Sequence, residues 1–198
     1  MRARASEPMR IEAGRFKGRQ LPRARGARPV PGRLRRSLFS VLAPRLEGAR
    51  VLDLFAGVGG LGLEALSRGA AEVVLVDQDG AAVRELQAFL ETVGATDEGR
   101  ALRRDALRGT LPAGPFDLVF VDPPFPLWDG PEGAALLARA VGVLAPDGLL
   151  VLKIPARLAL PEDPRWTERR RREVGTVAWA LVDPGPGADD RGREAEGP

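Results

Sequence analysis

Residues 51–62 read VLDLFAGVGGLG and place an apolar run directly before a glycine-rich loop. The run from Val51 to Phe55 predicts a buried strand. The loop then leads into a helix from Leu61 to Arg68, which Gly69 ends. A strand, a glycine loop and a helix in this order indicate an open α/β sheet, in which ligands bind at the carboxyl ends of the strands.

The same alternation continues along the chain. Asp79 can cap a helix whose apolar stripe ends at Gly94. Such alternation implies right-handed crossovers, and so an α/β, Rossmann-like fold with a mostly parallel sheet covered by helices on both faces. Further strands are expected over residues 72–76, 101–104, 116–121 and 149–154, with a final antiparallel strand over 174–182.

The ends of the chain differ in composition from this region. The composition of residues 1–8 predicts a disordered extension, and that of residues 9–31 predicts a small strand or hairpin. From Gly32 an amphipathic helix with a basic outer face is expected, and Pro44 ends it. We therefore divide the chain into a basic arm (9–48), an α/β domain (49–183) and a disordered acidic, Gly- and Pro-rich tail (184–198).

Composition excludes several kinds of chemistry. The 198 residues include no Cys, His or Tyr, which removes Ser-His-Asp and Cys-His catalysis and thiolate or imidazole zinc sites. Carboxylates, two lysines, hydroxyls, backbone groups and a cofactor remain, and we expect no metal. The sequence has neither an apolar run of membrane-spanning length nor a secretion signal, so we expect a cytoplasmic protein without membrane contact.

Charge is distributed unevenly. Residues 1–50 contain 14 basic and 3 acidic residues, a balance of +11, and the rest contains 30 − 14 = 16 basic and 27 − 3 = 24 acidic residues, a balance of −8. A basic arm on an acidic body favours a polyanionic partner, since each neutralised phosphate releases counterions. The alternative is a preference for Arg codons, because Arg outnumbers Lys 28 to 2. That preference alone would scatter the charge along the chain.

The glycine loop is compatible with two cofactors. Gly57, Gly59 and Gly62 fit the dinucleotide pattern G-x-G-x-x-G, with Asp77 where a ribose-binding acid belongs. Asp53, however, ends the strand before the loop and would repel a pyrophosphate. S-adenosylmethionine has no phosphate and carries an ammonium and a sulfonium, which an acidic site attracts. The loop therefore favours S-adenosylmethionine over NAD.

Acids follow three successive strands. Besides Asp53, Asp77 can accept hydrogen bonds from ribose hydroxyls, and Asp105 from the adenine amino group. Each acid alone can equally be a helix cap or a turn residue. Three of them at one edge of the sheet favour a ligand-binding rim.

Asp122-Pro123-Pro124-Phe125 follows the most hydrophobic strand and should emerge beside the same rim. If Asp122 and the Pro123 carbonyl accept hydrogens from the amino group of a base, its lone pair can face a methyl donor. Catalysis then consists mostly of alignment, and Phe125 offers a face on which the base can stack. The alternative is a rigid turn after a buried strand.

These motifs resemble the Class I methyltransferases with a (D/N/S)PP(Y/F/W) motif, and in particular the bacterial RsmD-type guanine-N2 methyltransferases of 16S ribosomal RNA. The likeness runs from about Met9 to Val182. It also includes Gly62–Ala70 and the N-terminal residues Arg10-Ile11, Gly14-Arg15, Gly18-Arg19, Leu21, Arg28-Pro29, Arg33 and Leu38-Phe39. The chain departs from the family pattern at Val30-Pro31-Gly32, at Arg36, and at Asp77, where the family has Glu.

The resemblance implies S-adenosylmethionine as cofactor and guanine 966 of 16S ribosomal RNA as target, in free RNA or in an assembling small subunit, with a monomeric enzyme. It implies a catalytic segment from Asp122 through Pro123 and Pro124 to Phe125. Cofactor contacts would come from Asp53, Phe55, Ala56, Gly57, Gly59, Asp77, Gln78, Asp105, Ala106 and Asp122. RNA contacts would come from Arg10, Arg15, Lys17, Arg19, Arg28, Arg33 and Arg36. Adenine-N6 methylation of DNA or RNA, and a non-catalytic RNA-binding module, remain alternatives.

Overall fold

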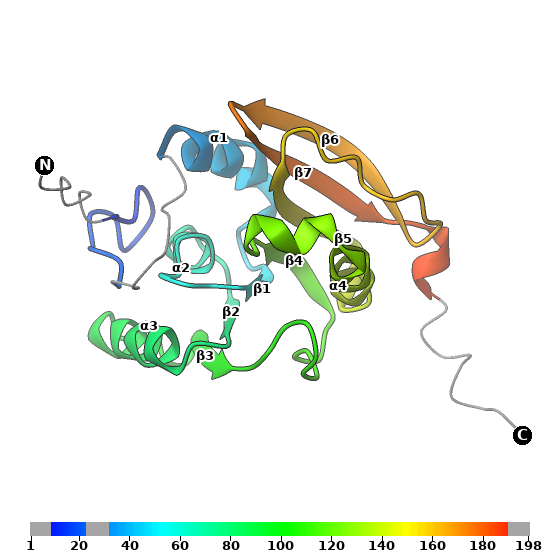
Figure 1. Cartoon of the computed structure of the whole chain (residues 1–198). Coiled ribbons are helices and arrows are strands. Elements are labelled where there is room, and N and C mark those ends of the chain that lie inside the picture. The colour runs from blue at the N-terminus through cyan, green and yellow to red at the C-terminus, as the bar shows by residue number, and fades with distance from the viewer. Residues whose placement is uncertain (1–8, 23–31, 190–198) are drawn as a thin grey trace, which may run out of the picture.

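The computed structural model describes residues 9–22 and 32–189 and contains a seven-stranded sheet in the order β3-β2-β1-β4-β5-β7-β6 (Figure 1). The first five strands in this order are parallel, and β7 runs antiparallel to both of its neighbours, β5 and β6. The strands are β1 (Arg50–Leu54), β2 (Glu72–Asp77), β3 (Gly99–Arg103), β4 (Phe116–Val121), β5 (Leu144–Pro155), β6 (Trp166–Val174) and β7 (Val177–Pro184).

Helices cover both faces of the sheet, as Figure 1 shows. The apolar residues of α1, α2 and α3 join one buried cluster, and those of α4 join a second cluster on the opposite face. This arrangement confirms the predicted Rossmann-like class. The helices are α1 (Gly32–Leu42), α2 (Gly62–Ser67), α3 (Gly80–Thr92) and α4 (Pro131–Val141), with short 3-10 turns η1 (Ala43–Arg45), η2 (Phe125–Asp129) and η3 (Pro186–Asp189). None of the helices in the described ranges is long and apolar enough to span a membrane.

Two elements were not predicted from the sequence. Helix α4 begins at Pro131, a residue favoured in the first turn of a helix, and buries Leu136 and Leu137. Strand β6 is almost wholly exposed and has no apolar alternation. It pairs with β7 through backbone hydrogen bonds, and these do not depend on side-chain polarity.

The arm is part of the core rather than an appendage. Ile11, Leu21 and Phe39 belong to the same buried cluster as the central strands. An isolated antiparallel bridge joins Arg10 to Gln20, so the predicted hairpin is reduced to one bridge around a turn. The amphipathic helix is confirmed as α1, although Pro44 lies within the 3-10 turn that extends it.

The structure describes part of one of the two segments predicted to be disordered, residues 1–8 and 184–198. Residues 1–8 and 190–198 lie outside the described residues, and so do residues 23–31 of the predicted strand or hairpin. At the start of the expected tail, however, residues 184–189 are ordered. The Gly185 N–H donates to the Arg165 carbonyl at 2.7 Å, and Ala188 is buried against the second cluster. Order therefore extends through η3.

Candidate active site

The glycine loop turns tightly at the carboxyl end of β1. Phe55, Gly57 and Gly59 all have positive φ, at 63°, 53° and 75°, a region in which glycine is unstrained and phenylalanine is not. A Cβ at Gly57 would meet only the Phe55 carbonyl oxygen, at 3.9 Å. The backbone at Gly57 therefore leaves room for a ligand to approach closely.

Asp53 lies beneath this loop. Its side chain is buried, and one carboxylate oxygen accepts from the Gly62 N–H at 2.8 Å. A Cβ at Gly62 would lie 2.3 Å from the Leu75 Cδ2, so only glycine lets the loop come this close. The pKa of Asp53 is raised to about 8, mainly by burial, which the Gly62 hydrogen bond opposes and to which the charges of Asp122 and Asp77 add. The three acids therefore share one electrostatic environment.

The raised pKa of Asp53 predicts how the stability of the protein changes with pH. Because the folded value, about 8, exceeds the ordinary value of 3.8, the stability associated with Asp53 is present below about pH 4 and is lost as the pH rises through about 8. Asp53→Asn cannot ionise. In urea unfolding without cofactor from pH 5 to 9, its free energy of unfolding should rise relative to the wild type as the pH rises.

Asp129→Asn, at an exposed position, is the matched control and should follow the wild-type profile. Parallel profiles for Asp53→Asn and the wild type would contradict a buried carboxyl with a raised pKa.

The other predicted rim residues lie at the ends of β2 and β3. Asp77 accepts from the Gly57 N–H at 2.8 Å and from the Asp79 N–H at 2.9 Å, so it links the two loops. Asp105 accepts from the Leu107 N–H at 2.8 Å. Gln78 is exposed, and Ala106 is buried in the second cluster. The parallel register of β1, β2 and β3 brings these loops to the same edge of the sheet.

The Asp-Pro-Pro-Phe segment continues from β4, the neighbour of β1. Pro123 is buried, Pro124 is exposed, and Phe125 is half-buried at the start of η2. The Leu127 N–H donates to the Pro124 carbonyl at 3.0 Å. In the same turn, the Trp128 indole donates to the Lys153 carbonyl at 3.1 Å. The segment is thus attached to β5.

Lys153 is a site residue that the sequence analysis missed. Its Nζ forms an ion pair with Asp122 and lies 5.8 Å from the centre of the Phe125 ring. Burial raises the pKa of Asp122, while Lys153 opposes the shift. A signal existed, because Lys153 is one of only two lysines in an arginine-rich chain and falls within a predicted strand.

The predicted RNA-binding residues of the arm have different surroundings. Lys17 and Arg19 are exposed, and within the described residues neither side chain has an ion-pair partner. Arg15 pairs with Glu98 and lies over the Phe16 ring, with its guanidinium carbon 4.6 Å from the ring centre. The two others with described side chains are Arg10, which donates to the Gly18 carbonyl, and exposed Arg36, which lies 3.7 Å from Glu12. Arg28 and the Arg33 side chain lie outside the described part of the structure.

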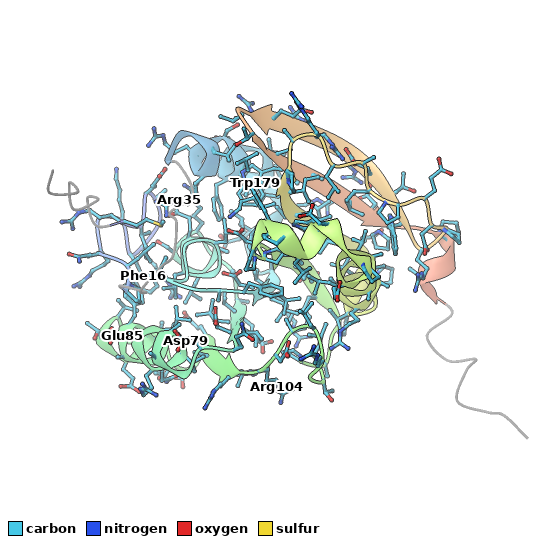
Figure 2. All side chains as sticks on the ribbon, viewed as in Figure 1. Phe16, Arg35, Asp79, Glu85, Arg104 and Trp179 are labelled. Carbon is cyan, nitrogen blue, oxygen red and sulfur yellow. The ribbon has the colours of Figure 1, made fainter. Side chains whose placement is uncertain are left out.

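Two buried side chains of α2 hold the arm. The Glu64 carboxylate accepts from the backbone N–H groups of Glu12 and Ala13 at 2.8 and 3.1 Å, and from Arg68 at 2.7 Å. The Ser67 hydroxyl donates to the Ala13 carbonyl and accepts from the Phe16 N–H. Arm residues Phe16 and Arg35 are labelled in Figure 2. Because α2 begins at the glycine loop, these contacts join the arm to the site.

Known proteins resemble this arrangement over nearly the whole chain. The family model described as conserved hypothetical protein 95 matches residues 9–183. Ribosomal RNA small subunit methyltransferase D of Escherichia coli K12 is 37% identical over 196 residues, which cover 97% of this chain and 93% of that protein. Its counterpart in Haemophilus influenzae is 32% identical and covers 89% and 94%. A solved E. coli structure, provisionally assigned as methyltransferase yhhF, has a TM-score of 0.76 at 36% identity and covers 90% and 98%.

Proposed function

Since the chain belongs to the conserved hypothetical protein 95 family, that of the RsmD-type methyltransferases, we propose that it methylates the exocyclic N2 of a guanine in 16S ribosomal RNA with S-adenosylmethionine. Guanine 966 is the target that the family likeness favours. The observation that carries the proposal is the Asp122–Lys153 ion pair beside Phe125, at the sheet edge that also bears the glycine loop and its acids.

The residues at this edge fit the proposed cofactor. Asp53, Asp77 and Asp122 are close enough for the charges of the other two to raise the pKa of Asp53, so a cation between them would relieve their repulsion. The open backbone at Gly57 gives a ligand room beside these acids. A pyrophosphate would add to the repulsion, which argues against NAD.

The residues of the Asp-Pro-Pro-Phe segment would align the acceptor. Phe125 can stack on the guanine, and Asp122 can accept a hydrogen from its amino group, which turns the nitrogen lone pair toward the glycine loop. Bound S-adenosylmethionine supplies a methyl group on a positively charged sulfur, open to in-line attack. Asp122 can then take the proton that the methylated nitrogen releases, because its raised pKa makes it a stronger base than an exposed carboxylate.

The substrate is tested with labelled cofactor on 16S ribosomal RNA, on the small ribosomal subunit and on duplex DNA, followed by mass spectrometry of the nucleosides. We expect N2-methylguanosine in the RNA or in the subunit. Label in N6-methyladenine of DNA would contradict the proposal and favour the adenine-N6 alternative. Binding of RNA without transfer of label to any substrate would favour the non-catalytic module.

Lys153 is expected to act as a positioning residue for Asp122. In Lys153→Met the carboxylate loses its cation, so the pKa of Asp122 should rise and the rising limb of the kcat profile should move to higher pH. A fall in kcat of about tenfold or more is expected from lost alignment. Affinity for S-adenosylhomocysteine, measured by calorimetry, should change little.

Arg84→Met is the matched control, since it removes a cation from an exposed position on α3, away from the candidate site. It should leave the kcat profile in place. A lower kcat in Lys153→Met without any movement of the profile would assign Lys153 a purely structural role.

A further inference from the structure

Strand β6 presents four consecutive arginines at the free edge of the sheet. Arg169, Arg170, Arg171 and Arg172 follow one another in a strand that pairs only with β7. They supply four of the 16 basic residues found beyond residue 50, where acidic residues number 24. A concentrated basic segment on an acidic body marks this edge as different from the rest of the domain.

The four arginines divide by sheet face. Arg169 pairs with Asp183, while Arg171 pairs with Glu168 and donates to the Leu158 carbonyl at 2.5 Å. Arg170 and Arg172 are exposed, and among the described residues no side-chain partner accompanies either of them. Two of the four arginines therefore make contacts within the protein, and the other two are available to bind a partner.

The free arginines share a sheet face with Lys153 of the candidate active site. In an antiparallel pair, residues directly opposite one another share a face, and Arg170 and Arg172 lie opposite Leu181 and Trp179. Both of these partners belong to the buried cluster under α1, and Trp179 is labelled in Figure 2. Arg170 and Arg172 thus extend this face beyond its buried part.

The register also places Arg172 in line with the site. Trp179 lies opposite Arg172 on one side and opposite Lys153 on the other. Since neighbouring strands are about 4.8 Å apart, the backbones of Arg172 and Lys153 are separated by roughly 10 Å. The Asp122–Lys153 pair and Arg172 therefore lie in line across the sheet, and Arg170 lies two residues before Arg172 in β6, opposite Leu181.

We propose that Arg170 and Arg172 form a docking surface for the phosphate backbone of the RNA substrate, beside the site that takes the base. This inference rests on the proposed function and extends it, because the RNA contacts expected from the sequence all lie in the arm. Arginine suits the task, since its planar guanidinium binds phosphate oxygens in pairs. An alternative role for charged side chains on an edge strand is to prevent sheets from joining edge to edge. That role would not require the arginines to bind RNA.

The test compares Arg170→Gln/Arg172→Gln with the wild type. Binding to 16S ribosomal RNA transcribed in vitro is measured between 50 and 200 mM salt. We expect roughly tenfold weaker binding and a slope of log affinity against log salt that is smaller by about 2, because each lost phosphate contact lowers it by about 1. The affinity for S-adenosylhomocysteine should not change. In methylation assays, KM for RNA should rise while kcat at saturating RNA stays within about twofold.

Arg84→Gln/Arg100→Gln is the matched control. It removes the same charge from two exposed positions, Arg84 on α3 and Arg100 on β3, the opposite edge strand, where Arg100 pairs with Glu72. This control should retain the wild-type salt slope. An unchanged slope in Arg170→Gln/Arg172→Gln, or an equal loss in the control, would overturn the docking surface.

The experiments distinguish a failure of the docking surface from a failure of the proposed function. If the wild type binds RNA but transfers no methyl group, the proposed function fails, and the binding comparison still decides the role of Arg170 and Arg172. If the wild type does not bind RNA, both fail. Binding to phosphatidylserine vesicles that depends on these arginines, with RNA binding unaffected, would overturn the proposal in favour of an anionic membrane surface.

Discussion

Asp122→Ala should lower kcat by about 10² to 10⁴, the range typical of losing a positioned acid-base group, while affinity for S-adenosylhomocysteine stays within a few-fold. The carboxylate is partly buried and pairs with Lys153 beside Phe125. In the proposed mechanism, its loss removes both the acceptor that orients the amino group and the base that takes its proton. Single-turnover methylation of 16S ribosomal RNA, with calorimetry of the cofactor product, measures the two effects separately.

Asp122→Asn distinguishes the two roles of Asp122. Asparagine keeps one oxygen acceptor but cannot take a proton, so near-normal turnover would reduce the role to alignment. A loss as large as that of Asp122→Ala would assign the proton step to Asp122. Asp129→Ala, an exposed acid in the adjoining 3-10 turn, should behave as the wild type. Unchanged turnover in Asp122→Ala would remove Asp122 from the mechanism altogether.

Glu64→Ala should destabilise the protein by about 3–5 kcal/mol, as breaking a buried ion pair does, and so lower Tm by roughly 6–20 °C. The side chain is 1% exposed and accepts from two backbone N–H groups of the arm and from Arg68. Its removal leaves three donors without their partner. Thermal unfolding measures the loss, and faster hydrogen exchange at the Glu12 and Ala13 amides would locate it in the arm.

Two variants make the Glu64 result specific. Glu64→Gln keeps one oxygen that can accept hydrogen bonds from the arm, and it should lose less stability than the alanine variant. Glu85→Ala, at an exposed position on α3, should change the free energy of unfolding by less than about 0.5 kcal/mol. If Glu64→Ala loses no more than Glu85→Ala, the arm is not held by this carboxylate. If Lys17 and Arg19 bind RNA as the family resemblance implies, a destabilised arm should also lower RNA affinity.

Local patterns predicted much of the fold. The helix from Asp79 is the clearest case, because its cap and apolar stripe are both local features, and the structure shows Asp79 accepting from the Ala81 N–H at 2.8 Å. The apolar runs of β1 and β4 likewise identified strands buried on both faces. Helix α4 was missed, and so was β6, whose charged side chains carry no periodic signal.

Local patterns predicted less of the site. The glycine loop and the acids near the carboxyl ends of β1, β2 and β4 were recognisable as candidates, since backbone freedom and carboxylate chemistry belong to residue types at given spacings. Lys153 was not, because it lies 31 positions beyond Asp122 and meets it only because β5 pairs with β4. The sequence also placed Asp53 simply at the rim, whereas the structure buries it under the loop with a raised pKa.

The difference between the features that local patterns predicted and those that they missed has a physical basis. Periodicity, capping and turn residues act over a few neighbouring positions, and so the order of elements and the chemistry available at the loops follow from the chain alone. Pairing, register and burial depend on which distant segments become neighbours. Only the folded chain therefore determines that Glu64 holds the arm and that Lys153 meets Asp122. It also determines that Arg170 and Arg172 share a sheet face with Lys153, while Arg169 and Arg171 form ion pairs.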